Sequence, residues 1–149
     1  MLARRGRRDP ADYSDRVNLR RVLLVVAGGA AGTAARLALG MLLADAGVLP
    51  VLIANVVGAF LIGVLMARPF LRLSGAARVE LRLLLGTGAL GGFTTYSAFM
   101  TGTVGLWADA PLLAVAYAAG SLVLGLAAAA SGLRLGRPRA ERLSTGAAS

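Results

Sequence analysis

The chain has 149 residues, of which 57% are hydrophobic and only 15% are charged. Its apolar runs are too long for ordinary packed helices, so we expect a small polytopic membrane protein with one domain rather than a soluble enzyme. The net charge of +9 comes entirely from Arg, and the placement of these residues beside apolar runs favours contact with anionic lipid and disfavours nucleic-acid binding.

Basic, polar tails flank the apolar part of the chain. Residues 1–21 predict a disordered cytoplasmic tail, and residues 134–149 predict a second one. The apolar run after the first tail has about 22 residues, which is too long for the hydrophobic part of a signal peptide. We therefore expect three parts: a basic tail, a four-helix transmembrane domain over residues 22–133, and a basic C-terminal tail.

Four apolar segments predict four transmembrane helices, and the fold class is an all-α membrane protein. The first segment, about 22–43, has a centre of small residues suited to close helix packing. The second covers about 48–67 and ends at Arg68-Pro69, and the fourth covers about 112–133. The third runs from about 79 to 107 and is interrupted.

The placement of Arg predicts the orientation. Fifteen of the 16 Arg residues lie in or beside the two tails and in the connection after the second segment, and none lies in the turns at 44–47 and 109–111. Because positive segments stay in the cytoplasm, we expect both termini there. The connection at 70–78 is expected to be partly helical and to lie at the membrane interface.

The interruption of the third segment is the stretch Gly86–Phe99, which reads G-T-G-A-L-G-G-F-T-T-Y-S-A-F. In hydrocarbon an unpaired backbone group costs several kcal/mol, so a broken helix survives only when it is buried in protein or lines a watery cavity. We therefore expect a functional site here. If the run Gly91–Thr95 unwinds, its backbone carbonyls become available to a hard cation. A glycine kink relieved by the Thr side chains is the alternative.

Two polar side chains lie within the first two segments. Arg36 is the one charge inside the first segment, where a charge at mid-helix costs about 2.5–3.5 kcal/mol on the insertion scale. It is either a snorkelling side chain near the outer end or a charge that attracts an anion, and the lack of Asp or Glu in the interior of the segments favours the second. Asn55 is either an interhelical hydrogen bond or a donor that lines a pore.

Aromatic and hydroxyl side chains follow the interruption. Tyr96 and Phe99 are three residues apart and share a helix face, so they either pack in a core or turn their positive ring edges toward an anion. Tyr117 and Ser121 share a face of the fourth segment. No pair of nucleophile and base is present, and no Cys or His, which excludes thiolate catalysis and Cys/His metal sites and disfavours any enzyme. The missing membrane carboxylate disfavours proton-coupled efflux.

Three stretches resemble the motifs of the Fluc (CrcB) fluoride channel family, and the resemblance covers about Leu19–Leu133. They are Gly28–Arg36 (G-G-A-A-G-T-A-A-R), Ala54–Gly63 (A-N-V-V-G-A-F-L-I-G) and Gly86–Phe99. The resemblance implies an antiparallel dimer of four-helix subunits in the bacterial plasma membrane, with the third helix broken mid-membrane. It also implies two fluoride pores at the interface, passive export of fluoride, and a structural sodium ion at the centre.

The resemblance assigns roles to particular residues. It implies that sodium is held by the backbone carbonyls of Gly91 and Thr94 and that Arg36 is the vestibule charge. The residues that it implies for the fluoride pore are Asn55, Tyr96, Ser97, Phe99, Tyr117 and Ser121. Three positions depart from the family pattern and alter the polarity of the pore: Tyr96 replaces the usual Phe, Ala98 a common Thr, and Val51 a frequent hydroxyl residue.

The charge asymmetry bears on the partner. A homodimer whose subunits insert in both orientations needs a weak charge bias, whereas the Arg distribution here fixes one orientation. We therefore expect pairing with a homologous subunit of opposite orientation, with self-pairing as the alternative. Two other functions stay open: a small four-helix transporter of the multidrug type, and a non-conducting structural subunit of a heterodimeric channel.

Overall fold

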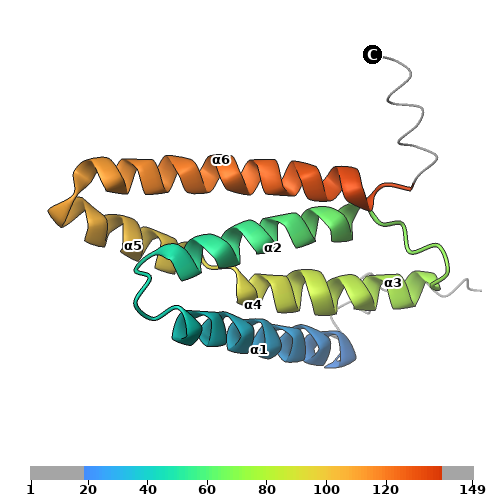
Figure 1. Ribbon diagram of the computed structural model, residues 1–149. Helices are drawn as coiled ribbons and strands as arrows, with labels where there is room; N and C mark the ends of the chain where they lie inside the picture. The colour runs from blue at the N-terminus through green and yellow to red at the C-terminus, as the bar shows by residue number, and fades with distance from the viewer. Residues whose placement is uncertain (1–18, 139–149) are drawn as a thin grey trace, which may run out of the picture.

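The computed structural model describes residues 19–138, which form helices joined by short connections (Figure 1). The two predicted tails therefore lie mostly outside the described residues. The third predicted segment consists of several consecutive pieces, one of them a π-helix. In chain order the elements are α1 (Leu19–Leu42), α2 (Leu49–Ala67), α3 (Gly75–Arg82), the π-helix η2 (Leu83–Leu90), α4 (Gly91–Phe93), α5 (Tyr96–Asp109) and α6 (Pro111–Gly136).

Proline and hydroxyl side chains set the helix ends. Pro50 and Pro111 lie in the first turns of α2 and α6, where a helix does not need the missing N–H. Pro69 follows the end of α2 and disfavours helical geometry in the residue before it. The hydroxyl of Ser74 accepts a hydrogen bond of 3.3 Å from the N–H of Ala77 and so caps α3. The connection predicted to be partly helical is thus helical from Gly75 onward.

Three helices within residues 19–138 are long and apolar enough to cross a membrane: α1, α2 and α6. Their bounds lie within three residues of the predicted segments. The prediction of an all-α membrane protein is confirmed at this level. The pieces between Gly75 and Asp109 are individually shorter than these three helices.

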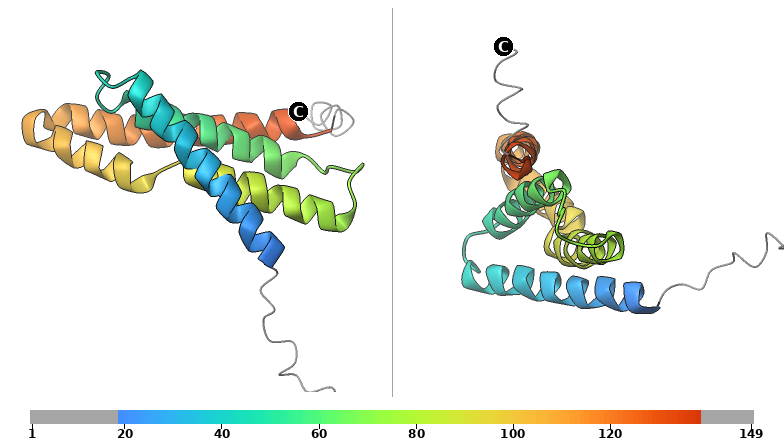
Figure 2. Two further views of the ribbon diagram at one scale, coloured as in Figure 1. Left: turned by 90° about the horizontal axis from the view of Figure 1, so that it is seen from below. Right: turned by 90° about the vertical axis from the view of Figure 1, so that its right-hand side faces the viewer.

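Helices α2 to α6 pack side by side along one long axis (Figure 1). Helix α2 lies between α6 and the row of α3, η2 and α4, while α5 packs against α6. Helix α1 packs on η2 and α4 and crosses the other long helices obliquely, as Figure 2 shows. Most large apolar side chains on α1 and α6 remain exposed in the single chain, as expected for surfaces that face lipid or another subunit.

Glycines allow the close approach of these helices. Gly28 of α1 and Gly88 of η2 face each other, and a Cβ on Gly28 would collide with the carbonyl oxygen of Leu84. Gly63 of α2 and Gly132 of α6 likewise pack against the backbone of the opposite helix. Small residues let membrane helices approach closely, which confirms the packing role predicted for the centre of the first segment.

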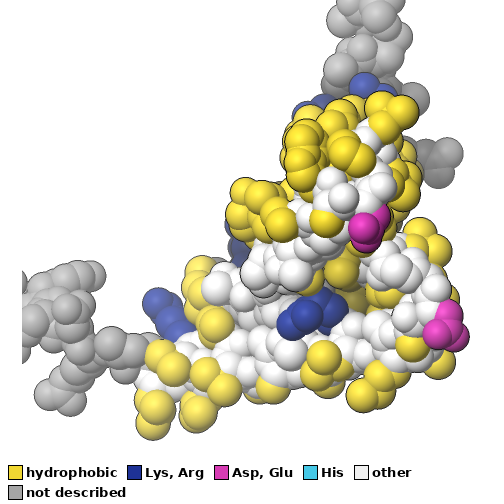
Figure 3. All heavy atoms as spheres, turned by 90° about the vertical axis from the view of Figure 1, so that its left-hand side faces the viewer, with side chains coloured by type: hydrophobic (Ala, Val, Ile, Leu, Met, Phe, Trp, Pro, Cys, Tyr) yellow, Lys and Arg dark blue, Asp and Glu magenta, His cyan; other side chains and the backbone are white. Residues whose placement is uncertain are grey.

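The two ends of the molecule differ in charge. The start of α1, the connection between α2 and α3, and the end of α6 lie at one end, and all described Arg residues except Arg36 lie in or beside them (Figure 1). Arg20 and Glu80 form an ion pair of 2.8 Å there. The turn after α1 and the turn at Ala110 lie at the other end, where acidic side chains are visible on the surface (Figure 3).

Candidate functional site

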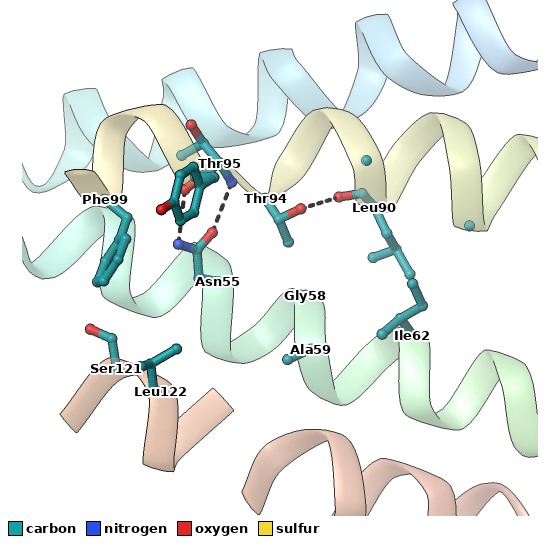
Figure 4. A pocket seen from close by; sticks show the side chains of 13 residues that line it. Asn55, Gly58, Ala59, Ile62, Leu90, Thr94, Thr95, Phe99, Ser121 and Leu122 are labelled. Carbon is teal, nitrogen blue, oxygen red and sulfur yellow. Dashed lines mark hydrogen bonds between the residues drawn. The ribbon is translucent and has the colours of Figure 1, made fainter. Parts of the chain in front are cut away.

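The break after α4 is made by two adjacent threonines. Thr94 and Thr95 are extended, with ψ angles of 157° and 121°, between the helical Phe93 and Tyr96. The hydroxyl of Thr94 donates to the carbonyl of Leu90 over 2.9 Å (Figure 4). The hydroxyl of Thr95 accepts from the N–H of Ala98 over 3.3 Å. One threonine therefore closes the preceding helix, while the other caps the start of α5.

Gly91, Gly92 and Phe93 stay helical, so the unwinding is narrower than the predicted run Gly91–Thr95. The glycines at 86 and 88 lie instead in the π-helix η2, whose backbone packs against α1. Glycine permits this close contact, whereas a threonine side chain can replace a lost backbone hydrogen bond. The two residue types thus have different roles within one stretch of sequence.

Asn55 of α2 binds the backbone at the break with both ends of its amide. Its Nδ2 donates to the carbonyl of Thr95 over 3.0 Å, and its Oδ1 accepts from the N–H of Thr95 over 2.8 Å (Figure 4). Asn55 therefore makes interhelical hydrogen bonds, which was one of the two roles predicted for it. One N–H of the amide is left over from these two bonds, so the role of a pore donor remains a prediction.

The break leaves backbone carbonyls without their helical donors. Gly92 finds substitutes on α1, because its carbonyl accepts from the Thr33 hydroxyl over 3.4 Å and from Arg36 Nε over 3.3 Å. Within residues 19–138 no donor contacts the carbonyl oxygen of Gly91 or Thr94. These are the two carbonyls assigned to a cation by the family resemblance, and oxygen is the ligand that hard cations prefer.

A cleft of about 440 Å³ lies beside the break. Several predicted site residues from four helices line it, and Figure 4 shows the side chains of Asn55, Phe99 and Ser121 around one space. The cleft is also lined by three further predicted site residues, Gly91, Thr94 and Tyr96.

Three aromatic rings form a row next to this cleft. The ring centres of Tyr96 and Phe99 are 6.0 Å apart, and those of Phe99 and Tyr117 are 5.4 Å apart. Tyr96 is 75% exposed, whereas Tyr117 is 8% exposed and its hydroxyl has no hydrogen-bond partner in the described part of the chain. Such an unpaired buried hydroxyl is costly, which makes it a candidate for contact with a ligand.

Three predicted site residues, Ser97, Tyr117 and Arg36, do not line this cleft, whereas Ser121 does. The Ser121 hydroxyl lines the cleft but donates to the carbonyl of Tyr117 in its own helix, over 2.6 Å. Ser97 is exposed, with its hydroxyl 3.2 Å from that of Thr95. Arg36 is half-buried on α1 and meets the break through Gly92 rather than through the cleft.

The sequence interpretation missed Thr33, Gly92 and Thr95 as individual site residues. Thr33 lies three residues before Arg36, a spacing that puts both on one helix face and could have indicated a shared target. Nothing in the sequence links either residue to Gly92, which is 56 to 59 positions away.

Comparison with known families gives a match to the family described as "CrcB-like protein, Camphor Resistance (CrcB)", over residues 23–133. The chain belongs to the CrcB family. The matched range includes every residue of this chain that is named above for the break and the cleft, and it leaves out both tails.

Several curated relatives in the CrcB family are similar over most of the chain. The "Fluoride-specific ion channel FluC 2" of Leifsonia xyli subsp. xyli is 43% identical over 78% of this chain and 83% of its own length. The "Fluoride-specific ion channel FluC" of Agrobacterium fabrum is 44% identical over 78% of this chain and 95% of its own. The protein of the same name from a strain of Thermus thermophilus is 43% identical over 79% and 96%, respectively.

Proposed function

We propose that this chain is a subunit of a fluoride-selective ion channel that lowers cytoplasmic fluoride by passive export. The observation that carries the proposal is the cleft in which Asn55, Phe99 and Ser121 meet beside a broken helix. The proposal is supported by relatives named fluoride-specific ion channels, which are 43–44% identical over 78–79% of the chain.

The chemistry of the cleft suits a small, strongly hydrated anion. A pore that strips water from fluoride must supply donors and positive ring edges in its place. The row of Tyr96, Phe99 and Tyr117 supplies the rings, and the unpaired Tyr117 hydroxyl and the remaining N–H of Asn55 supply donors. Ser97 and Ser121 add hydroxyl groups near the two ends of this row.

The proposed channel has four membrane spans, of which the third is made by α3, η2, α4 and α5 together and is broken at Thr94–Thr95. The hydrogen bonds of Asn55, Thr95, Thr33 and Arg36 support such a break in the membrane, because they give new partners to several of the backbone groups that lose helical bonds there. Arg36 would then lie in the outer half of the membrane as the vestibule charge, anchored on Gly92.

A structural sodium ion fits the carbonyls of Gly91 and Thr94, which have no donor among the described residues. Two oxygens are fewer than the roughly six that a hard cation such as Ca²⁺ takes, so further oxygens would come from a second subunit. When bound, sodium would provide a fixed positive charge close to the path of the anion. This requirement supports an antiparallel dimer around the break.

We place the protein in the bacterial plasma membrane with both termini in the cytoplasm. The one-sided distribution of Arg supports this orientation. The same asymmetry favours a homologous partner that inserts the opposite way over a second copy of this chain.

Fluoride efflux from liposomes tests the proposal. The protein is reconstituted alone and together with a homologous chain of reversed charge bias, and efflux is followed with a fluoride electrode. We expect rapid efflux of fluoride and not of chloride, without a proton gradient, in at least one of the two preparations. Activity only with the partner identifies the heterodimer.

Two results would contradict the channel. Transport that requires a proton gradient would favour the multidrug-type transporter. No fluoride efflux in either preparation, with both proteins folded, would reject the proposed function altogether. Empty liposomes serve as the control for leakage.

A further inference from the structure

A second cleft, of about 400 Å³, lies at the basic end of the molecule, between the connection after α2 and the end of α6. Three Arg side chains line it: Arg68, Arg72 and Arg137. We call it the arginine cleft. It is remote in sequence from the break and shares no lining residue with the cleft beside Asn55.

No carboxylate of the described residues neutralises the arginine cleft. Of the three in this part of the chain, Asp45 and Asp109 lie at the opposite end, and Glu80 is paired with Arg20. Arg68 and Arg72 make no ion pair within residues 19–138. Arg68 and Arg72 therefore have no counter-charge within residues 19–138, and an anion from outside this part of the chain can supply it.

The negative ends of two helix dipoles offset only part of this positive charge. Arg68 follows the last residue of α2, and Arg137 follows the last residue of α6. Each helix C-terminus carries about half a negative charge, which a neighbouring Arg stabilises. The guanidinium groups of Arg68 and Arg72 alone outweigh two such helix ends, so the cleft keeps a net positive charge.

The backbone of the connection is held in a defined turn. Phe70 has a φ of 47°, a left-handed conformation that a bulky residue rarely adopts. The N–H of Leu73 donates to the carbonyl of Phe70 over 2.9 Å, and Arg78 Nε donates to the carbonyl of Leu73 over 3.1 Å. These bonds hold Arg72 in a fixed turn rather than on a loose loop. The backbone strain at Phe70 is typical of a functional segment.

The rim of the cleft is apolar and open, which distinguishes a lipid from a free anion. Leu71 is 77% exposed, and Leu135 of α6 is 54% exposed, directly beside the arginines. A soluble phosphate would use only the guanidinium groups, whereas a phospholipid would also cover these leucines with its acyl chains. Basic pockets at the cytoplasmic ends of membrane helices are suited to anionic headgroups.

We propose that the arginine cleft binds the phosphate headgroup of an anionic phospholipid of the cytoplasmic leaflet, with Arg68 and Arg72 on the phosphate. The inference rests on the proposed orientation of the basic end, and it does not depend on fluoride transport. Planar guanidinium groups can hold phosphate oxygens in pairs, which a diffuse basic surface would not do.

Lipid binding to the purified full chain in detergent tests the proposal. Phosphatidylglycerol and phosphatidylcholine are titrated separately, and bound lipid is counted by native mass spectrometry. We expect tight retention of phosphatidylglycerol only, and a loss of about tenfold or more in apparent affinity in the double variant Arg68→Gln/Arg72→Gln. Millimolar inorganic phosphate should not displace the lipid.

The matched control is the double variant Arg21→Gln/Arg134→Gln, which removes the same charge at the same end from outside the cleft. Equal losses in both double variants would overturn the proposal in favour of diffuse attraction. Full displacement by inorganic phosphate would overturn it in favour of a soluble anion.

A second pair of variants keeps the test valid if loss of the arginines prevents folding. Leu71→Glu adds a negative charge at the exposed rim, and Leu42→Glu adds one at a similarly exposed Leu at the other end of the molecule. We expect weaker binding of phosphatidylglycerol only for Leu71→Glu. Unchanged binding in this variant would reject the site. A failure of fluoride efflux would leave this readout unaffected.

Discussion

At the scale of single residues, Asn55 has the most constrained position in the site. Its amide bonds to both the N–H and the carbonyl of Thr95, two backbone groups at the break. Asn55→Leu keeps the size of the side chain and removes both bonds. We expect a loss of about 1–3 kcal/mol in unfolding free energy, because two backbone groups lose their partners.

Thermal unfolding in detergent measures this change, and fluoride efflux measures its effect on the channel, which we expect to be strongly reduced. Thr101→Val is the control, since the Thr101 hydroxyl is exposed and bonds only within its own helix, to the carbonyl of Ser97. An Asn55→Leu protein as stable as the control would show that Asn55 does not hold the break.

The two tyrosines of the aromatic row give a second prediction. Tyr117→Phe removes a buried hydroxyl that has no partner in the described chain, so stability should not fall. If that hydroxyl donates to fluoride, efflux should slow. Tyr96→Phe removes an exposed hydroxyl at the other end of the row and should leave efflux unchanged.

Efflux rates of the two variants in the active assembly, compared with their melting temperatures, check this pair. Equal rates for wild type and Tyr117→Phe would remove Tyr117 from the list of fluoride donors. A slower Tyr96→Phe channel would instead make the Tyr at that position, where the family usually has Phe, a functional departure.

At the scale of elements, the packing of α1 on η2 and α4 supports the break from the side opposite to Asn55. A Cβ on Gly32 would collide with the carbonyl oxygen of Ala89 and crowd the N–H of Phe93, whereas a Cβ on Gly40 of the same helix has nothing within 4 Å. Gly32→Ala should therefore destabilise the protein by about 1–3 kcal/mol through overpacking.

Gly40→Ala is the matched control and should be neutral or stabilising by up to about 1 kcal/mol, because Ala favours the helix. The melting temperatures of the two variants give the comparison. Similar values would mean that α1 can move away from η2 without cost. Such freedom would also detach Thr33 and Arg36 from the carbonyl of Gly92.

At the scale of the whole molecule, the separation of charge between the two ends predicts a single orientation. The chain has no Cys, so one introduced Cys is a unique label. We expect Ala44→Cys, in the turn after α1, to react with a membrane-impermeant maleimide in intact cells. Ser149→Cys should react only after the cells are permeabilised, because the basic segments stay inside.

Comparable labelling of both positions in intact cells would show dual orientation and would favour a homodimer. Expression of the chain alone in cells without a fluoride exporter is the companion test. Full rescue of fluoride resistance by the chain alone would remove the need for an oppositely oriented partner.

The amino-acid sequence alone determined the class of protein, the approximate bounds of the long helices and the family. These properties depend on local composition: apolar runs of membrane length, Pro and Gly at helix ends, and Arg outside the runs. The tertiary structure decided which groups meet at the break. Thr95 bonds to Asn55 across 40 positions, and Gly92 bonds to Thr33 and Arg36 across 59 and 56 positions. Such partners depend on how α1 and α2 pack around the third segment, because a broken helix must find its missing hydrogen bonds on its neighbours.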